Sequence, residues 1–145
     1  MKLHLAIVVG FLSVFEISAA QTAGSNYPFD GAWDVLYDCP ESSEKEGARS
    51  FDKKFSAKIE SGQFVGSYRA EGVPGNMQLV GVVDQEGVAD LEAHGHTVDP
   101  RASVNRLQRG TAYRFKVSAR FNEKSGSGER IGRRTCTFIF SRQKP

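Results

Sequence analysis

The chain has 145 residues, and its 19 Lys and Arg against 17 Asp and Glu give a net charge of +2 at pH 7. A charge this small says little about partners by itself, and we expect no nucleic-acid partner and no cofactor. Beyond the first twenty residues there is no second long apolar run, so the sequence predicts no transmembrane segment.

The first twenty residues have the pattern of a secretory signal peptide. Lys2 precedes an apolar run from Leu5 to Phe15, and the small residues of Ser18–Ala20 follow at the spacing of a cleavage site. We therefore predict a signal peptide over 1–20, a mature chain that begins at Gln21, and a periplasmic or secreted protein. Residues 21–145 are long enough for a single exported domain.

The two cysteines, Cys39 and Cys136, favour one disulfide, because an exported chain folds in an oxidising compartment. The alternative is a pair of free buried thiols. A bridge between them would close almost the whole mature chain into one loop. In the chain-entropy model, a loop of that length stabilises the fold by about 4–5 kcal/mol.

Positive charge is concentrated in the second part of the chain. Residues 21–95 contain six Lys and Arg against thirteen Asp and Glu, and residues 96–145 contain twelve against three. This asymmetry indicates a basic C-terminal half that meets a partner.

Segments with a period of two follow one another along the mature chain and are separated by turn residues. In the first, Trp33, Val35, Tyr37 and Cys39 share one face. The expected strands cover 33–39, 50–59, 64–70, 77–83, 88–96, 112–121 and 133–141.

Other local patterns refine this organisation. Lys53 interrupts the apolar face of its segment and indicates a sheet edge or a bulge. Pro74 and Gly75 occupy the central positions of a type II turn. Residues 101–109 can form a single helical turn, and the glycine-rich stretch 123–132 is expected to be a turn.

The pattern predicts an all-β protein: an antiparallel up-and-down β-barrel, lipocalin-like, with seven to eight strands and closed by one disulfide. A β-sandwich is the alternative. Gly66 and Gly81 fall in mid-strand, where they leave room or mark bends. The mature chain also has eight Phe, four Tyr and one Trp, so both a filled core and a ligand cavity stay open.

Three stretches resemble a group of small exported β-domain proteins from proteobacteria that have no established activity. They are "FDGAWDV" near the start, "GVPGNMQLVGVVDQEGVADL" in the middle and "GSGERIGRRTCTFIF" at the end. The group shares an F-D-G-x-W start, a Pro-Gly turn and an R-x-C-x-F end, and Ala32 stands here where Thr is more usual. These motifs are structural, so the resemblance implies a fold and carries over no functional residue. A looser architectural likeness exists to periplasmic β-barrel protease inhibitors.

His94 and His96 are the weak candidates for a metal site, because two imidazoles on one strand face can bind zinc or copper. No further histidine occurs in the mature chain. We therefore predict no metal and interpret the pair as part of a solvated outer face.

The basic residues on the strands are expected to pair with acids. Arg114, Lys116 and Arg120 would lie beside Asp90 and Glu92 of the preceding strand. At the seam of the barrel, Arg133 and Arg134 are expected to face Asp34 and Asp38.

The loop arginines Arg101, Arg106 and Arg109 have fewer acidic neighbours and are the predicted partner-binding residues. We expect a monomeric, non-catalytic binding module that meets a protein or an anionic envelope component through these loops. The alternatives are a small-ligand-binding barrel, a periplasmic protease inhibitor or, less favoured, a hydrolase. No catalytic residue is predicted, because the chain has no Gly-x-Ser-x-Gly elbow and both cysteines serve the structure.

Overall fold

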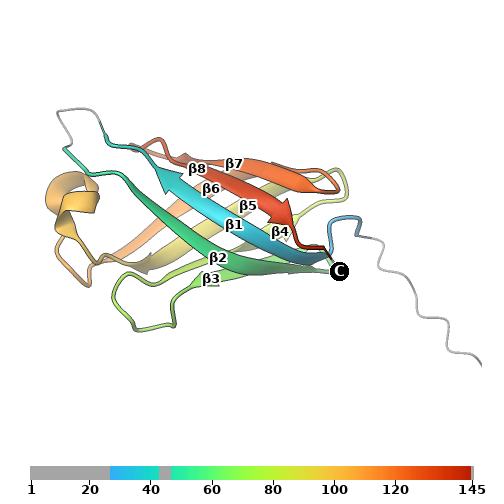
Figure 1. Ribbon diagram of the computed structural model, residues 1–145, viewed down its shortest axis with the longest axis horizontal. Helices are drawn as coiled ribbons and strands as arrows, with labels where there is room; N and C mark the ends of the chain where they lie inside the picture. The colour runs from blue at the N-terminus through green and yellow to red at the C-terminus, as the bar shows by residue number, and fades with distance from the viewer. Residues whose placement is uncertain (1–26, 43–46, 145) are drawn as a thin grey trace, which may run out of the picture.

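The computed structural model describes residues 27–42 and 47–144 and is a closed, antiparallel, eight-stranded β-barrel (Figure 1). The predicted signal peptide and Gln21 lie outside the described residues. The strands are β1 (Gly31–Cys39), β2 (Phe51–Glu60), β3 (Gln63–Tyr68), β4 (Met77–Val83), β5 (Val88–His96), β6 (Ala112–Phe121), β7 (Ser125–Ile131) and β8 (Thr137–Arg142). The predicted up-and-down barrel is confirmed.

Each strand pairs with its neighbours in sequence, and β1 pairs with β8 to close the barrel. The predicted disulfide spans this seam: Cys39 is the last residue of β1 and Cys136 directly precedes β8, with 4.4 Å between their Cα atoms. The disulfide therefore links β1 to β8, the first and last strands, at the pairing that closes the barrel. Among the described residues, no helix is long and apolar enough to cross a membrane.

The prediction of a turn over 123–132 was wrong, because most of this stretch is β7. Its glycines serve close packing. A Cβ on Gly128 would lie 2.8 Å from the Cβ of Ala119, and one on Gly126 would lie 3.0 Å from the ring of Phe121. Glycine in a strand often marks such close approaches, and its turn-like composition concealed the eighth strand.

Aromatic rings fill the half of the barrel that contains the chain ends. The ring of Trp33 meets Phe121 edge-on at 5.1 Å, and Phe140 packs against both Phe64 and Phe121. Trp33, Phe64 and Phe140 are fully buried. The prediction that Trp33, Val35, Tyr37 and Cys39 face the interior is confirmed.

Residues 27–30 close this end of the barrel. Phe29 is buried, and its carbonyl accepts a hydrogen bond of 3.0 Å from the Trp33 indole. The Asp30 carboxylate accepts hydrogen bonds from the Ser61 and Gly62 amides and so holds the β2–β3 turn. The motif "FDGAW" thus covers one end of the barrel and holds the β2–β3 turn, so its role is structural.

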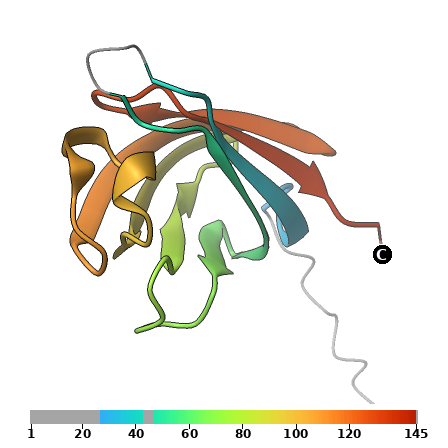
Figure 2. The same cartoon turned by 60° about the vertical axis from the view of Figure 1, so that its left-hand side comes forward.

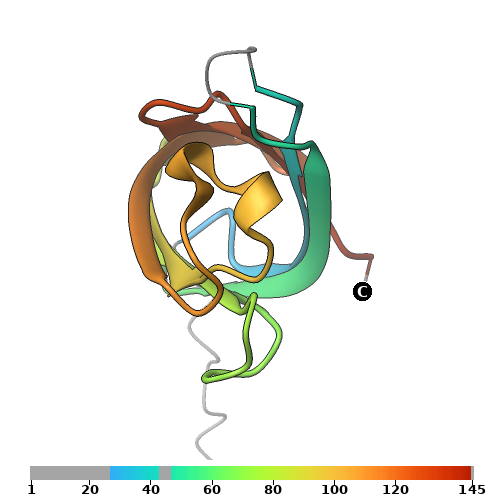
Figure 3. The ribbon, with the colours of Figure 1, turned by 90° about the vertical axis from the view of Figure 1, so that its left-hand side faces the viewer.

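The opposite end, called the mouth here, is covered by residues 97–110. Instead of the single expected helical turn, two short 3₁₀ turns form, η1 (Pro100–Ala102) and η2 (Val104–Arg106). Figure 3 looks along the barrel and shows this segment lying across the opening. Thr97 anchors the segment, since its amide donates to the Thr111 carbonyl and its hydroxyl donates to the Gln108 carbonyl.

The outer charges pair only in part as predicted. Arg114 forms a salt bridge of 3.4 Å with Glu92, and Lys116 lies opposite Glu92 in the register. Asp90, however, lies opposite Ser118. The register therefore places only one of the two predicted acids against the basic stripe, and Arg120 lies opposite Val88.

The predicted charge pairing at the seam was wrong. Asp34 and Asp38 lie opposite Ser141 and Thr137 of β8. Arg133 is exposed, whereas Arg134 is buried and donates hydrogen bonds to backbone carbonyls. Both arginines precede β8, so they lie beyond the part of the seam where the two strands pair.

Candidate ligand-binding cavity

A cavity of about 420 Å³ lies inside the mouth of the barrel. Its size falls within the range of about 300–1,000 Å³ that is usual for small-molecule sites. The lining comes from β1, β2, β3, β5, β6 and β7 and from the loops around the mouth. The lining residues used below are Tyr37, Phe51, Lys53, Tyr68, Arg69, His96, Tyr113, Phe115, Arg130 and Arg134.

β2 is longer than its pairing with β3. β2 pairs with β1 from Phe51 onwards, but its described pairing with β3 begins only at Ala57. Figure 2 shows the start of β2 standing apart from the loop that joins β3 and β4. Lys53 lies on this half-paired part, so the predicted sheet edge is confirmed, while the unbroken register with β1 gives no bulge.

Lys53 points into the cavity and is surrounded by aromatic rings. Its ammonium lies 5.7, 5.2 and 5.9 Å from the ring centroids of Phe51, Tyr68 and Tyr113. It also donates long hydrogen bonds to the Gly75 carbonyl (3.4 Å) and the Tyr113 hydroxyl (3.5 Å). Burial, together with the nearby charge of Arg69, lowers the pKa of Lys53 to about 8.

Arg130 of β7 reaches the cavity from another wall. Its guanidinium lies 4.2 Å from the centroid of the Phe115 ring, and within the described part of the chain its buried Nε has no hydrogen-bond partner. Tyr37, stacked on Phe138 at 4.3 Å, lies nearby. Burial raises the pKa of the Tyr37 hydroxyl, and the charge of Arg130 opposes that rise. Burial also raises the pKa of Tyr113.

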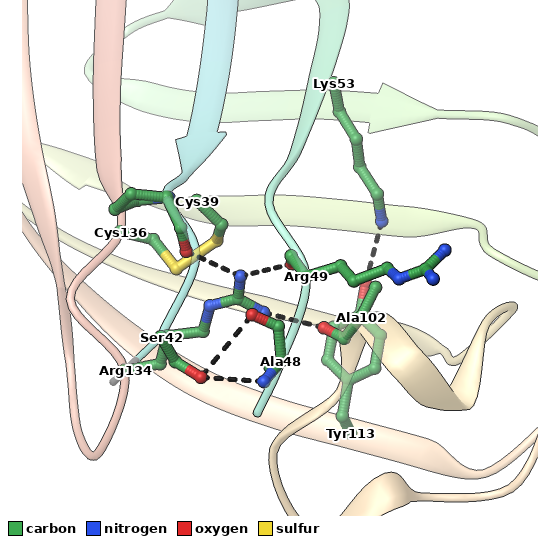
Figure 4. The surroundings of a disulfide bond; sticks show 10 residues. Cys39, Ser42, Ala48, Arg49, Lys53, Ala102, Tyr113, Arg134 and Cys136 are labelled. Carbon is green, nitrogen blue, oxygen red and sulfur yellow. Dashed lines mark hydrogen bonds between the residues drawn. A yellow bond between two sulfur atoms is a disulfide. The ribbon is translucent and has the colours of Figure 1, made fainter. Parts of the chain in front are cut away.

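Arg134 ties together the loops around the mouth. Its guanidinium donates to the carbonyls of Pro40 (2.7 Å), Arg49 (2.6 Å) and Ala102 (2.7 Å), beside the disulfide (Figure 4). These carbonyls belong to the segment after β1, the segment before β2 and the cover over the mouth. One buried arginine thus holds the cavity wall and its cover in place.

The three predicted partner-binding arginines lie on the cover, outside the lining of the cavity. The Arg101 guanidinium donates two hydrogen bonds of 3.0 Å to the Asp99 carboxylate, so the positive charge of Arg101 is largely compensated. The Asp99 pairing lowers the pKa of that carboxyl. Arg106 and Arg109 are exposed to solvent.

The two histidines lie on the face of β5 opposite to Leu91 and Ala93, as predicted, but His96, the last residue of the strand, also borders the cavity. Both histidines are hydrogen-bonded to amide side chains. His94 Nε2 lies 2.8 Å from Gln78 Oε1, and His96 Nδ1 lies 3.0 Å from Asn76 Oδ1. Across the described ranges, no group of three His, Cys, Asp or Glu residues is placed to hold a metal ion.

The barrel has both a filled core and a cavity, at different ends. The half in which β1 begins and β8 ends is filled with side chains, and the half near the mouth contains the cavity. The mid-strand glycines do not create that space. A Cβ on Gly66 would lie 2.9 Å from Ala57 and from the Phe55 ring, and Gly81 lies against the backbone of Asp90 and Leu91.

Sequence reasoning missed Lys53 and Arg130 as site residues. Lys53 gave a signal, a lone charge on an apolar strand face, but only the barrel shows that this face lines a cavity. Arg130 gave none, because its segment was interpreted as a turn.

Comparison of the chain with protein-family models and with the sequences of curated proteins finds no match in either.

Proposed function

We propose that this is an exported, non-catalytic binding protein that takes a small ligand into the cavity at the mouth of its barrel. The observation that carries the proposal is the cavity itself: about 420 Å³, walled by aromatic rings and provided with a few charged and hydroxyl groups. Sites for small molecules usually combine these features. The disulfide supports an oxidising compartment, and hence a periplasmic or secreted location.

The polar groups of the cavity support binding rather than catalysis. His96, the histidine of the lining, is hydrogen-bonded through Nδ1 to Asn76. A serine or cysteine nucleophile needs a base within hydrogen-bond reach, and both cysteines are in the disulfide. The groups that do converge, Lys53, Arg130 and two tyrosine hydroxyls, are suited to holding a ligand.

A second candidate function is attachment to an anionic envelope surface through the cover. It is favoured by the exposure of Arg106 and Arg109 on a segment that lies across the mouth. The pairing of Arg101 with Asp99 weakens it, because one of the three predicted charges is already compensated. Binding of this kind would be screened by salt.

Nuclear magnetic resonance tests the proposed function. The ¹⁵N-labelled protein is titrated with a panel of uncharged, anionic and cationic molecules that have short aliphatic or aromatic bodies. Ligands of the cavity should shift the amide signals of Lys53, Thr97 and Tyr113 and leave the Trp33 indole signal, at the filled end, unchanged. If no member of the panel shifts the lining signals selectively, the small-ligand function is wrong.

A further inference from the structure

We infer that the ligand of this cavity is an anionic amphiphile, a carboxylate on a short apolar body, with Lys53 and Arg130 binding the carboxylate. The inference rests on the proposed function, since it names the class of ligand for the same cavity. It is carried by the charge balance of the lining, by the absence of acidic partners for two inward-facing cations, and by the aromatic walls.

The lining has an excess of positive charge. Among the residues that the structure describes, it contains five Lys and Arg residues against two aspartates. One of these, Asp99, is already bonded to Arg101, and the other, Asp52, lies on the exposed face of β2. The field inside the mouth therefore favours an anion over a cation.

Lys53 and Arg130 have no acidic partner within the described ranges 27–42 and 47–144. The salt bridges found there join Lys58 to Glu60, Arg101 to Asp99 and Arg114 to Glu92. Lys53 has two long hydrogen bonds, and the buried Nε of Arg130 has none. Buried charges in proteins are normally paired, so the Lys53 ammonium has donor capacity left for a ligand, and the charge of Arg130, which interacts with the Tyr37 hydroxyl, is not neutralised by an acid of the described ranges.

The two cations line the cavity from different walls. Lys53 belongs to β2 and Arg130 to β7, which are separated round the barrel by β1 and β8. The Arg130 guanidinium lies 4.2 Å from the centroid of the Phe115 ring and also interacts with the Tyr37 hydroxyl. A guanidinium can donate two parallel hydrogen bonds to the two oxygens of a carboxylate.

The remaining walls suit an apolar body. Phe51, Tyr68, Tyr113 and Phe115 line the cavity, and Tyr113 and Phe115 stack on each other at 5.9 Å. A ring of aromatic side chains can also hold a quaternary ammonium ligand. Here the ammonium of Lys53 already occupies that position, which excludes a ligand cation and leaves the rings to cover a hydrocarbon or aryl group.

Calorimetric titration with sodium octanoate, 1-octanol and inorganic phosphate tests the inference. Octanoate and octanol share the same chain, so their difference reports the carboxylate. A hydrogen bond to a charged group corresponds to about tenfold to hundredfold in affinity. Octanoate should bind at least about tenfold more tightly than octanol. Lys53→Met should reduce that advantage about tenfold or more, and Lys54→Met, the neighbour on the outer face of β2, should leave the binding of both molecules unchanged.

A pH series tests the role of Lys53 without any loss of side-chain length. Octanoate affinity in the wild type should fall by about tenfold to a hundredfold in total above pH 8 and then level off, as the free amine loses its proton and the charged contact is lost. Lys53→Arg stays charged, so its octanoate affinity should stay level over the same range. The comparison isolates position 53 from the other titratable or charged groups that line the cavity: Tyr37, Arg49, Asp52, Tyr68, Arg69, His96, Asp99, Tyr113, Arg130 and Arg134.

The possible outcomes separate the inference from the function on which it rests. Equal binding of octanoate and octanol, or a Lys53→Met protein that keeps the preference, overturns the inference and leaves a neutral-ligand cavity. Phosphate binding as tight as octanoate binding also overturns it, because the apolar body would then contribute nothing. Binding of none of the three overturns it too, and the wider panel then decides the proposed function. If Lys53→Met does not fold, the wild-type and Lys53→Arg pH profiles decide the inference.

Discussion

Removing the charge of Lys53 should flatten the pH dependence of stability between pH 8 and pH 10. The folded protein holds the pKa of Lys53 at about 8, against 10.5 for the free side chain. A shift of this size corresponds to about 3 kcal/mol, at 1.36 kcal/mol per unit. The contacts of the ammonium with three rings favour the charged form, so about 3 kcal/mol is an upper bound.

The sign follows from proton binding. Between pH 8 and 10.5 the unfolded chain keeps a proton on Lys53 that the folded protein has lost, so stability rises with pH over this range. Tyr37 and Tyr113 act in the opposite direction above pH 10, because burial raises the pKa of both hydroxyls above their ordinary value of 10.0. The clean window is therefore pH 8 to pH 10, and the expected gain there is about 1–3 kcal/mol.

Urea unfolding, followed by the fluorescence of Trp33, measures this gain. The wild type, Lys53→Met and the matched control Lys54→Met are compared at pH 7, 8, 9 and 10. The midpoint should rise with pH in the wild type and in the control, and should stay nearly constant in Lys53→Met. If Lys53→Met shows the same rise as the wild type, the amine is not held in the cavity as the structure places it, and the reasoning is refuted.

Three further predictions concern the scaffold and the loops. Mass spectrometry of the exported protein should show Gln21 at the N-terminus and a mass two hydrogens below that of the reduced chain; a retained Met1 or two alkylatable thiols would contradict this. Trp33→Ala should lower the free energy of unfolding by about 3–5 kcal/mol, because a fully buried ring is lost, whereas a solvent-like Trp33 emission spectrum in the native state would contradict its burial. Binding to anionic vesicles, if the cover mediates it, should fall with salt and decrease in the Arg106→Ser/Arg109→Ser protein. The further change Arg101→Ser should add little, since Arg101 is paired with Asp99, and vesicle binding that ignores salt would rule this function out.

Period-two patterning was enough to predict seven of the eight strands, the inward face of β1 and the barrel. Side chains alternate between the two faces of a strand, so Trp33, Val35 and Tyr37 could be placed inside without any tertiary information. The Pro74–Gly75 turn was equally local: Gly75 has φ of +83° and the Asn76 amide bonds to the Val73 carbonyl, as the sequence indicated. The cysteine pair, together with the predicted signal peptide, was enough to predict the disulfide across the seam.

Other features depended on contacts between distant segments. Whether Gly126 and Gly128 belong to a turn or a strand depended on the rings and methyl groups opposite them. The burial of Arg134 depended on three carbonyls from segments up to 94 residues away. Neither kind of partner is visible in a local pattern.

The cavity was the feature that the sequence could least predict. A face of alternating apolar residues reads the same whether its side chains meet at the centre of the barrel or stop short of each other. Here rings meet around Trp33 and Phe140, while at the mouth β2 and β3 no longer pair and residues 97–110 lie across the open end of the barrel. In the sequence, Lys53 is a charged residue on an otherwise apolar strand face. Only the closed barrel determines which residues lie opposite that face, and it therefore shows that Lys53 faces a cavity.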